Sequence, residues 1–260
     1  MDSVIYYFSA TGNSLKVAKD IAAKVENTKL IKISSANMQP VDSKLYKKVG
    51  FVFPIYFYGL PIMVRKFIEN ITIDSSTYIY AVATCGASTG SAMAQINSIL
   101  DKKNIRLASA FKILMPGNYQ LMYSPPELEK QQKLFQLEAE RTAYISEKIN
   151  NSEAGIFEEN NTIAAKTFSS LIQRIFKPEN KDKNFWTEDT CNGCGVCSRV
   201  CPSNNILINN NKPNWQHQCE QCLACMHWCP KHAIQYKKGT IKRGRYTHPE
   251  IKANELFQEE

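Results

Sequence analysis

The sequence predicts an α/β fold, in which a doubly wound, five-stranded parallel sheet is followed by a small, cysteine-rich α+β domain. Two observations lead to this prediction. Strand-length apolar segments alternate with amphipathic helical segments through residues 1–150. Eight of the nine cysteines then fall within residues 191–230, in two runs of equal spacing. At 260 residues, the chain is long enough for one medium-sized domain and one small one.

The first unit is a strand, a small polar loop and a helix. Residues 3–8 (SVIYYF) have the pattern of a buried parallel strand, and residues 15–25 have one apolar helical face. The loop between them places N–H groups and hydroxyls at a helix N-terminus, which favours an anion. An ordinary helix cap is the alternative, because Thr, Asn and Ser all cap well. The candidate anion-binding residues are Ser9, Thr11, Gly12, Asn13 and Ser14.

The next two predicted strands are residues 29–33 and residues 48–55. Aromatic residues follow the second of these, just before Pro61 begins a helix. Aromatic side chains at the carboxyl end of a strand favour a flat ligand, although they can also simply cover an apolar edge. The candidate ligand-binding residues here are Pro54, Tyr56, Phe57, Tyr58 and Gly59.

Two further strands, residues 77–84 and 106–115, complete the predicted sheet before a helix over residues 127–150. A glycine-rich loop, residues 85–90, follows the first of them and allows close approach of its backbone to a ligand. Its thiol, Cys85, is interpreted as a packing side chain, with a thiol beside the ligand as the alternative. The candidates in and beside this loop are Thr84, Cys85, Gly86 and Gly90. Asn118 and Tyr119, in the long loop 116–126, are further candidates, and the alternative is that they are solvent-facing loop residues.

Residues 3–150 resemble the flavodoxins. Loop 9–14 is similar to their phosphate loop, which holds the FMN phosphate without a positive side chain, and loops 54–60 and 85–90 are similar to the two that flank the isoalloxazine ring. The resemblance implies the strand order 2-1-3-4-5, with FMN at the switch point between the first and third strands. No G-x-G-x-x-G motif is present, so NAD(P) binding by this domain is not indicated.

The two cysteine runs share the spacing C-x2-C-x2-C-x3-C, each followed by proline, and a shift of 28 positions superimposes them. Zinc sites usually contain two separated C-x2-C pairs, and disulfides require an oxidising compartment, for which no secretory signal is seen. The pattern therefore favours iron–sulfur clusters over zinc and over disulfides. The first run is Cys191, Cys194, Cys197 and Cys201, and the second is Cys219, Cys222, Cys225 and Cys229.

These runs resemble the two-[4Fe–4S] ferredoxins, in which the fourth cysteine of each run binds the cluster of the other run. The resemblance implies two [4Fe–4S] clusters. One cluster would be held by Cys191, Cys194, Cys197 and Cys229, and the other by Cys219, Cys222, Cys225 and Cys201.

The remaining segments are predicted to connect and flank these domains. Residues 151–184 are interpreted as a linker with a helix packed between domains, residues 185–240 as the ferredoxin domain and residues 241–260 as a polar, basic tail. His227, inside the second run, is expected to be exposed, with tuning of a cluster as the alternative. The basic cluster Lys237, Lys238, Lys242, Arg243 and Arg245 is either solvated surface or a docking site for an acidic redox partner.

The formal net charge is +8, but each oxidised cluster with its thiolates, and the flavin phosphate, would add about −2. The basic composition is thus partly offset by the cofactors, and no nucleic-acid partner is expected. No apolar run is long enough for a membrane span. The N-terminus lacks a signal-peptide layout, and cluster-binding thiolates suit a reducing compartment, so a cytoplasmic location is expected.

As a whole, the chain resembles bacterial proteins, mostly from anaerobes, that fuse a flavodoxin-like domain to a two-[4Fe–4S] ferredoxin. The resemblance implies an intracellular electron-transfer flavoprotein that passes electrons between FMN and a redox protein or a small-molecule acceptor. Reduction of a substrate at the flavin is a further option, although no catalytic acid–base pair stands out in the sequence. The alternative is a redox sensor or regulatory binding module. The sequence leaves the electron donor, the acceptor and the oligomeric state open.

Overall fold

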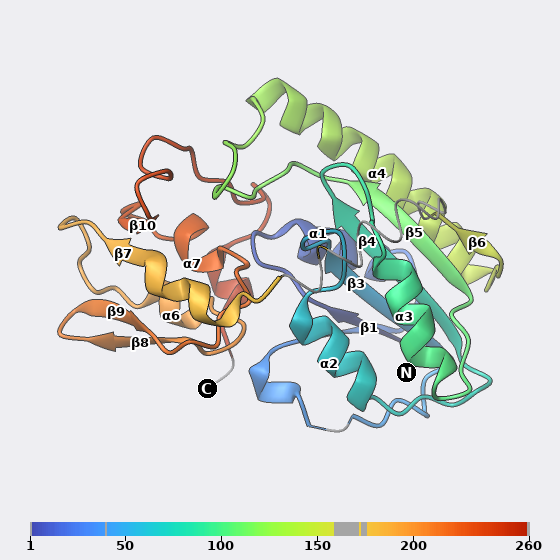
Figure 1. Cartoon of the computed structure of the whole chain (residues 1–260). Coiled ribbons are helices and arrows are strands. Elements are labelled where there is room, and N and C mark those ends of the chain that lie inside the picture. Colours follow the sequence, from blue (N-terminus) through green and yellow to red (C-terminus); the bar gives the residue numbers. More distant parts are fainter. Residues whose placement is uncertain (1, 40, 159–171, 173–175, 259–260) are drawn as a thin grey trace.

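The computed structural model describes residues 2–39, 41–158, 172 and 176–258. The chain forms a large α/β unit and a smaller cysteine-rich unit that lies against one end of it (Figure 1). No helix among the described residues is long and apolar enough to cross a membrane.

The α/β unit is built on a parallel sheet with the order β2-β1-β3-β4-β5-β6. The five predicted strands and their order are confirmed. The additional strand, β6, pairs with β5 over only two residues, too few to produce an apolar pattern in the sequence. The strands are β1 (Ser3–Tyr7), β2 (Thr28–Lys32), β3 (Lys48–Pro54), β4 (Tyr78–Cys85), β5 (Ser109–Leu114) and β6 (Ile156–Phe157).

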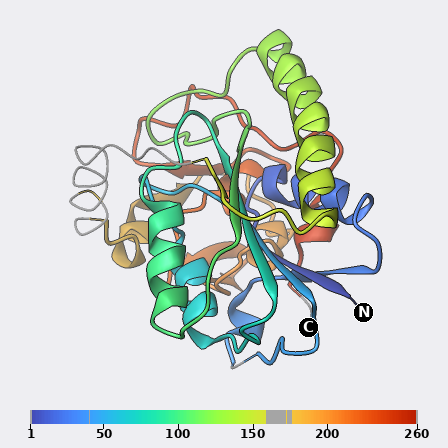
Figure 2. The same cartoon turned by 90° about the vertical axis from the view of Figure 1, so that its right-hand side faces the viewer.

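Helices cover both faces of this sheet (Figure 2). One face carries α1 (Asn13–Ala22) and α4 (Leu128–Asn150), and the other carries α2 (Ile62–Asn70) and α3 (Ala92–Asp101). Because both faces are buried, the central strands are continuous apolar runs. Phe51, Val52 and Phe53 of β3, for example, are all fully buried, although they point alternately to the two faces.

The interface between α1 and α4 contains a buried carboxyl group. Glu138 of α4 is only 2% exposed, and its Oε1 atom has no hydrogen-bond partner among the described residues. Burial, and then the negative charge of Asp20, raise the pKa of Glu138 to about 7, against a weaker opposing effect of Lys16. The folded state therefore binds a proton at this site more tightly than the unfolded chain does.

We expect Glu138→Gln to stabilise the protein at pH 8 by about 1 to 3 kcal/mol and to have little effect at pH 5. The pKa of Glu138 is higher in the folded state than the unfolded value of about 4.5. The contribution of protonated Glu138 to the free energy of unfolding is therefore lost as the pH rises through 7. Urea denaturation at both pH values measures the difference. Glu140→Gln, an exposed position on the same helix, is the control. An equal gain at both pH values would show that ionisation of Glu138 is not the cause.

The cysteine-rich unit consists of two structurally repeated halves. The 28-residue shift that superimposes the cysteines also superimposes α6 (Val196–Arg199) on α7 (Ala224–His227). Each helix is preceded by a residue in the left-handed conformation, Gly195 (φ 74°) in the first half and Leu223 (φ 65°) in the second. The other elements are η2 (Glu179–Asn184), β7 (Phe185–Thr187), β8 (Ile206–Asn209), β9 (Lys212–Trp215) and β10 (Ile234–Tyr236). Strand β7 pairs with β10, and β8 with β9, both antiparallel.

The helix predicted between the domains lies almost wholly outside the described residues. Phe176, at the end of that apolar stretch, is buried and stacks on Phe57, with the two ring centroids 3.9 Å apart. The end of the apolar stretch therefore packs against the loop that follows β3.

The prediction of a polar tail is wrong for the C-terminal segment, residues 241–258, which packs on the α/β unit and includes η3 (Ala253–Leu256). Tyr246, Ile251 and Leu256 are buried. Their apolar side chains have neither helical nor strand spacing, so periodicity does not reveal them. The backbone N–H of His248 donates to the Thr11 carbonyl at 2.8 Å, and that of Gln258 to the Arg199 carbonyl at 2.9 Å.

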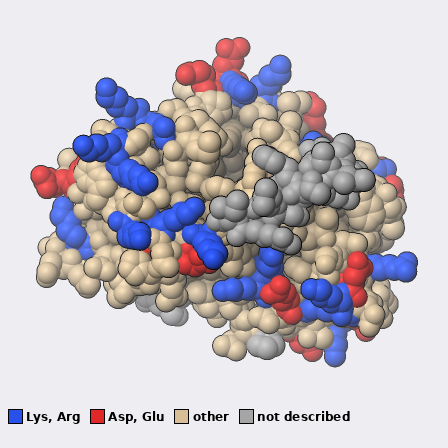
Figure 3. Space-filling view, viewed as in Figure 1, with Lys and Arg blue, Asp and Glu red and all other residues tan. Residues whose placement is uncertain are grey.

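Two arginines of the predicted basic cluster belong to this segment and form hydrogen bonds within the protein. Arg243 donates to the Gln120 carbonyl at 2.6 Å, and Arg245 donates to the Ile234 carbonyl at 2.9 Å. These two arginines therefore attach the C-terminal segment to loop 116–126 and to β10. Figure 3 shows Lys and Arg side chains gathered on the cysteine-rich unit, at the left of the view, with few acidic side chains among them.

Candidate cofactor sites

A cavity of about 680 Å³ opens where the carboxyl ends of β1, β3, β4 and β5 meet, within the size range usual for cofactor pockets. The predicted loops line it together. Among the candidates, Gly12, Gly59 and Gly90 do not line the cavity but shape its loops. Those that do are Ser9, Thr11, Asn13, Ser14, Pro54, Tyr56, Phe57, Tyr58, Thr84, Cys85, Gly86, Asn118 and Tyr119.

Most polar side chains of loop 9–14 form hydrogen bonds with neighbouring segments of the chain. Ser14 and Thr84 share a hydrogen bond of 2.8 Å between their hydroxyls, and Asn118 Nδ2 donates to Thr11 Oγ1 at 2.5 Å. The buried Ser9 hydroxyl differs, because it has no hydrogen-bond partner among the described residues. A buried polar atom without a partner, beside the N-terminus of α1, suits the phosphate of a bound FMN.

Gly12 has a role that the sequence did not reveal. Its φ of 102° requires glycine, as expected for a close turn. A Cβ atom at this position, however, would lie 2.9 Å from Cβ of His248 and 3.1 Å from Cβ of Ile251. The glycine therefore allows the C-terminal segment to cover the loop.

Loop 54–60 forms a two-residue turn with positive φ at both central positions, 47° at Phe57 and 61° at Tyr58. The N–H groups of Tyr56 and Gly59 each donate to the other residue's carbonyl, at 3.0 and 2.9 Å. Such turns favour Asn and Gly, so two aromatic residues here hold strain. The neighbouring loop stabilises this turn, because the Ser91 N–H donates to the Tyr58 carbonyl at 2.8 Å. The close approach requires glycine at position 90, where a Cβ atom would collide with the same carbonyl.

Cys85 behaves as a packing residue. Its side chain is buried, and burial raises the pKa of its thiol to about 11, against a smaller opposing effect of Lys112. The thiol is therefore protonated at neutral pH and is a poor nucleophile.

The cysteine-rich unit contributes a wall of the cavity that we did not predict, formed by Gln221, Cys222 and Leu223. The conformation of Leu223 is unusual, because left-handed backbone normally selects glycine, as at the equivalent Gly195. Leucine at the repeat position of a glycine was the signal in the sequence. Its side chain is 2% exposed and supplies apolar surface to the cavity.

The first predicted cysteine set comes together in space. Cys191, Cys194, Cys197 and Cys229 line a common small cavity, with Gly193 and Pro213 beside them. Burial, and then the nearby thiols of Cys229, Cys194 and Cys191, raise the pKa of Cys197 to about 12. Cys229 of the second run thus lies with three cysteines of the first.

The second set is arranged in the same way. Burial, followed by Cys201 and Cys219, holds the pKa of Cys222 well above its usual range. The pKa of Cys225 is raised by burial and then by Cys222, Cys219 and Cys201. Backbone N–H groups point at two of the sulfurs, from Asn205 to Cys201 at 3.3 Å and from Gln221 to Cys219 at 3.2 Å. Sulfur-only ligand sets that accept backbone hydrogen bonds suit iron–sulfur clusters. Among the described residues, no group of three or more His, Cys, Asp or Glu side chains is arranged to hold a single metal ion.

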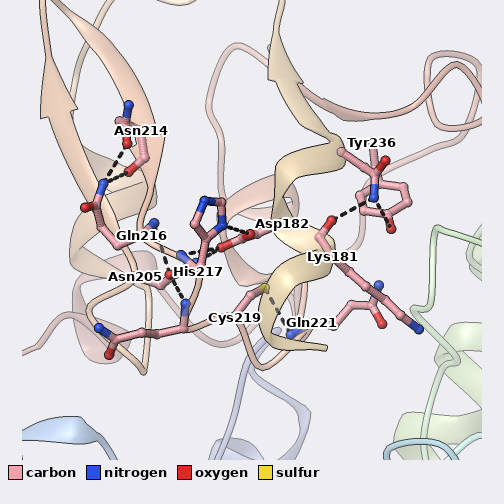
Figure 4. A network of polar contacts seen from close by, with 11 residues as sticks. Lys181, Asp182, Asn205, Asn214, Gln216, His217, Cys219, Gln221 and Tyr236 are labelled. Atoms are coloured by element: carbon pink, nitrogen blue, oxygen red, sulfur yellow. Dashed lines mark hydrogen bonds and ion pairs between the residues drawn. The ribbon is translucent and has the colours of Figure 1, made fainter. Parts of the chain in front are cut away.

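A buried carboxylate organises the chain around this second set (Figure 4). Asp182 of η2 is fully buried and accepts hydrogen bonds from the His217 backbone N–H and from Asn205 Nδ2, both at 2.9 Å. Its other oxygen lies 2.7 Å from His217 Nδ1. These contacts fix the stretch of chain that leads into Cys219.

The prediction that His227 is exposed is wrong, because its ring is buried between the cysteine-rich unit and loop 116–126. Its Nε2 lies 2.9 Å from the Asn118 carbonyl, and its Nδ1 lies 3.1 Å from the Tyr246 backbone N–H. Burial lowers the pKa of His227 to about 3, so the ring is neutral at physiological pH. Local sequence could not reveal this burial, because the covering residues belong to distant segments.

A family model described as a flavodoxin domain matches residues 4–136, just over half of the chain, and one described as a 4Fe-4S dicluster domain matches residues 183–230. No curated protein matches the chain at a significant level.

Solved structures similar to the chain include a flavodoxin from Streptococcus pneumonia TIGR4, at 13% identity over 56% of this chain and 99% of that one, with a TM-score of 0.36. An azoreductase from Bacillus anthracis str. Sterne shares 11% identity over 57% of this chain and 100% of that one, with a TM-score of 0.41. A flavoprotein in complex with FMN from Lactobacillus acidophilus NCFM shares 11% identity over 43% of this chain and 92% of that one, with a TM-score of 0.36. The two family matches, together with the topology, show that the chain belongs to the flavodoxin domain family and joins this domain to a 4Fe-4S dicluster domain.

Proposed function

We propose that this protein transfers electrons between FMN, bound in the 680 Å³ cavity, and one-electron partners, through two [4Fe–4S] clusters. When bound, FMN supplies two-electron chemistry and each cluster exchanges single electrons. The observation that carries the proposal is the position of Cys222. This residue belongs to the second cysteine set and also lines the flavin cavity.

The arrangement of the two sets supports a direction for the path. Cys197 of the first set and Cys225 of the second belong to one buried cluster of side chains, so the sets are adjacent. In the first set, Cys194 is exposed. The second set would therefore hold the cluster next to the flavin, and the first would hold the cluster that a redox partner reaches.

A reductase acting on a substrate at the flavin is a second candidate, favoured by one observation. The cavity extends past the predicted candidates Asn118 and Tyr119 to Met122 and Tyr123 in the same loop and to Lys130 of α4, and Met122 and Tyr123 are both exposed. A small acceptor would enter the cavity through this exposed part.

We expect about eight iron, eight sulfide and one FMN per chain after anaerobic purification. Two tightly bound zinc ions in place of iron would contradict the proposal. Anaerobic reduction by a low-potential donor, followed at the absorbance of both cofactors, then tests electron transfer. Turnover of a one-electron acceptor supports the transfer function and turnover of a small organic acceptor supports the reductase. Partner affinity that changes with cluster oxidation, without turnover, would instead favour a regulatory module.

A further inference from the structure

A buried hydrogen-bond network joins the cluster-binding helix α7 to the flavin cavity. His227 ends α7, between Cys225 and Cys229. Its Nδ1 atom accepts from the Tyr246 backbone N–H at 3.1 Å, which places the ring proton on Nε2. Nε2 then donates to the Asn118 carbonyl at 2.9 Å. The His227 ring therefore bridges the C-terminal segment and the loop after β5 through one hydrogen bond at each ring nitrogen.

The network continues to the phosphate loop by two routes. In the first, Asn118 Nδ2 donates to Thr11 Oγ1 at 2.5 Å. In the second, the Tyr246 hydroxyl donates to Asn13 Oδ1 at 2.6 Å, and Asn13 Nδ2 donates to the Pro116 carbonyl at 3.2 Å. Thr11, Asn13 and Asn118 all line the cavity, whereas His227 and Tyr246 do not. His227 and Tyr246 thus fix, through hydrogen bonds, three residues that line the cavity.

The network has little freedom to adjust. His227, Tyr246, Thr11 and Asn13 are each less than a tenth exposed. Water cannot easily replace a lost partner at such sites, so each deletion leaves a buried polar group unsatisfied. The indole N–H of Trp228, the next residue after His227, donates to the Ala10 carbonyl at 2.8 Å and holds the same loop from a third position.

We propose that His227 and Tyr246 are positioning residues for the flavin, which fix the phosphate loop and loop 116–119 in the conformation that binds it. The inference rests on the proposed binding of FMN in this cavity. It assigns part of the flavin site to the cysteine-rich unit and the C-terminal segment, through side chains that do not line the cavity.

The test measures the dissociation constant of FMN by titrating it into flavin-stripped, cluster-containing protein and following flavin fluorescence. We expect His227→Ala to weaken FMN binding about tenfold, and His227→Gln, whose amide can donate to Asn118, to recover most of the loss. Tyr246→Phe, which removes one hydroxyl far in sequence from the cysteines, should weaken binding several-fold at unchanged iron content. The matched controls, His232→Gln and Tyr144→Phe, replace exposed side chains and should bind FMN as the wild type does.

Wild-type affinity in Tyr246→Phe and in a His227 variant with full iron content would overturn the inference. If His227→Ala loses iron, Tyr246→Phe decides alone. Failure of His227→Gln to bind better than an iron-replete His227→Ala would also count against it, because a purely packing role would give no such rescue. A wild-type protein that binds no FMN would instead contradict the proposed function itself.

Discussion

Replacing Cys229 with alanine is expected to damage the proposed cluster of Cys191, Cys194 and Cys197, although these residues lie about 30 or more positions earlier in the sequence. Cys229 lines their cavity, and its thiol contributes to the raised pKa of Cys197. Loss of one thiolate exposes an iron corner, so we expect loss of that iron and a three-iron form. Electron paramagnetic resonance, combined with iron analysis, measures this result.

Cys201→Ala is the matched variant, because Cys201 is grouped with Cys219 and Cys222 of the other run. It should damage the second cluster and leave the first. FMN content should stay the same in both variants, since neither cysteine lines the flavin cavity. A second substitution in each run assigns the signals. If each variant loses the cluster of its own run, the exchange of fourth ligands is wrong for this protein.

Gly12→Val is expected to destabilise the protein by about 3 kcal/mol or more and to weaken FMN binding at least a hundredfold. Valine tolerates a φ of 102° poorly, and its Cβ would press on His248 and Ile251. We therefore expect the C-terminal segment to leave the phosphate loop. Thermal unfolding, limited proteolysis of residues 241–258 and FMN titration follow the three effects.

The control is Gly155→Val. Gly155 also has a positive φ, 86°, but a Cβ there would have no neighbour within 4 Å. This variant thus carries the backbone strain without the collision. If both variants lose stability equally and both keep the segment protected, the contact with His248 is unimportant. Retention of wild-type FMN affinity in Gly12→Val would show that the loop does not need its cover.

The parts of the molecule that follow local rules could be predicted from the sequence. Strand β3 is buried on both faces, and its residues are accordingly a continuous apolar run. The parallel topology brings Ser14 and Thr84 to one sheet edge, where their hydroxyls meet. The cysteine spacing follows from the shape of a cluster, which three close thiolates can wrap.

The parts that depend on contacts between distant segments could not be predicted. Tyr246, Ile251 and Leu256 are buried by surfaces far away in the chain, and their spacing matches no regular element. His227 lies in a polar, cysteine-rich stretch that suggested exposure, but loop 116–126 covers it. Likewise, the cysteine spacing indicates which sulfurs share a cluster, but it does not indicate which sulfur faces the flavin cavity. The position of Cys222 at that cavity becomes visible only when the two units are packed together.

The cover on the phosphate loop also sets an order of events during protein synthesis. The contact between Asn13 and Tyr246 spans 233 positions of the chain, whereas every strand of the α/β unit is complete by residue 157. A ribosome will thus have released a nearly finished α/β unit long before the residues that hold its phosphate loop are translated. Both cysteine runs are made in the interval. The hydrogen bond that holds Asn13 in the proposed flavin pocket can therefore form only after both cysteine runs have been synthesised.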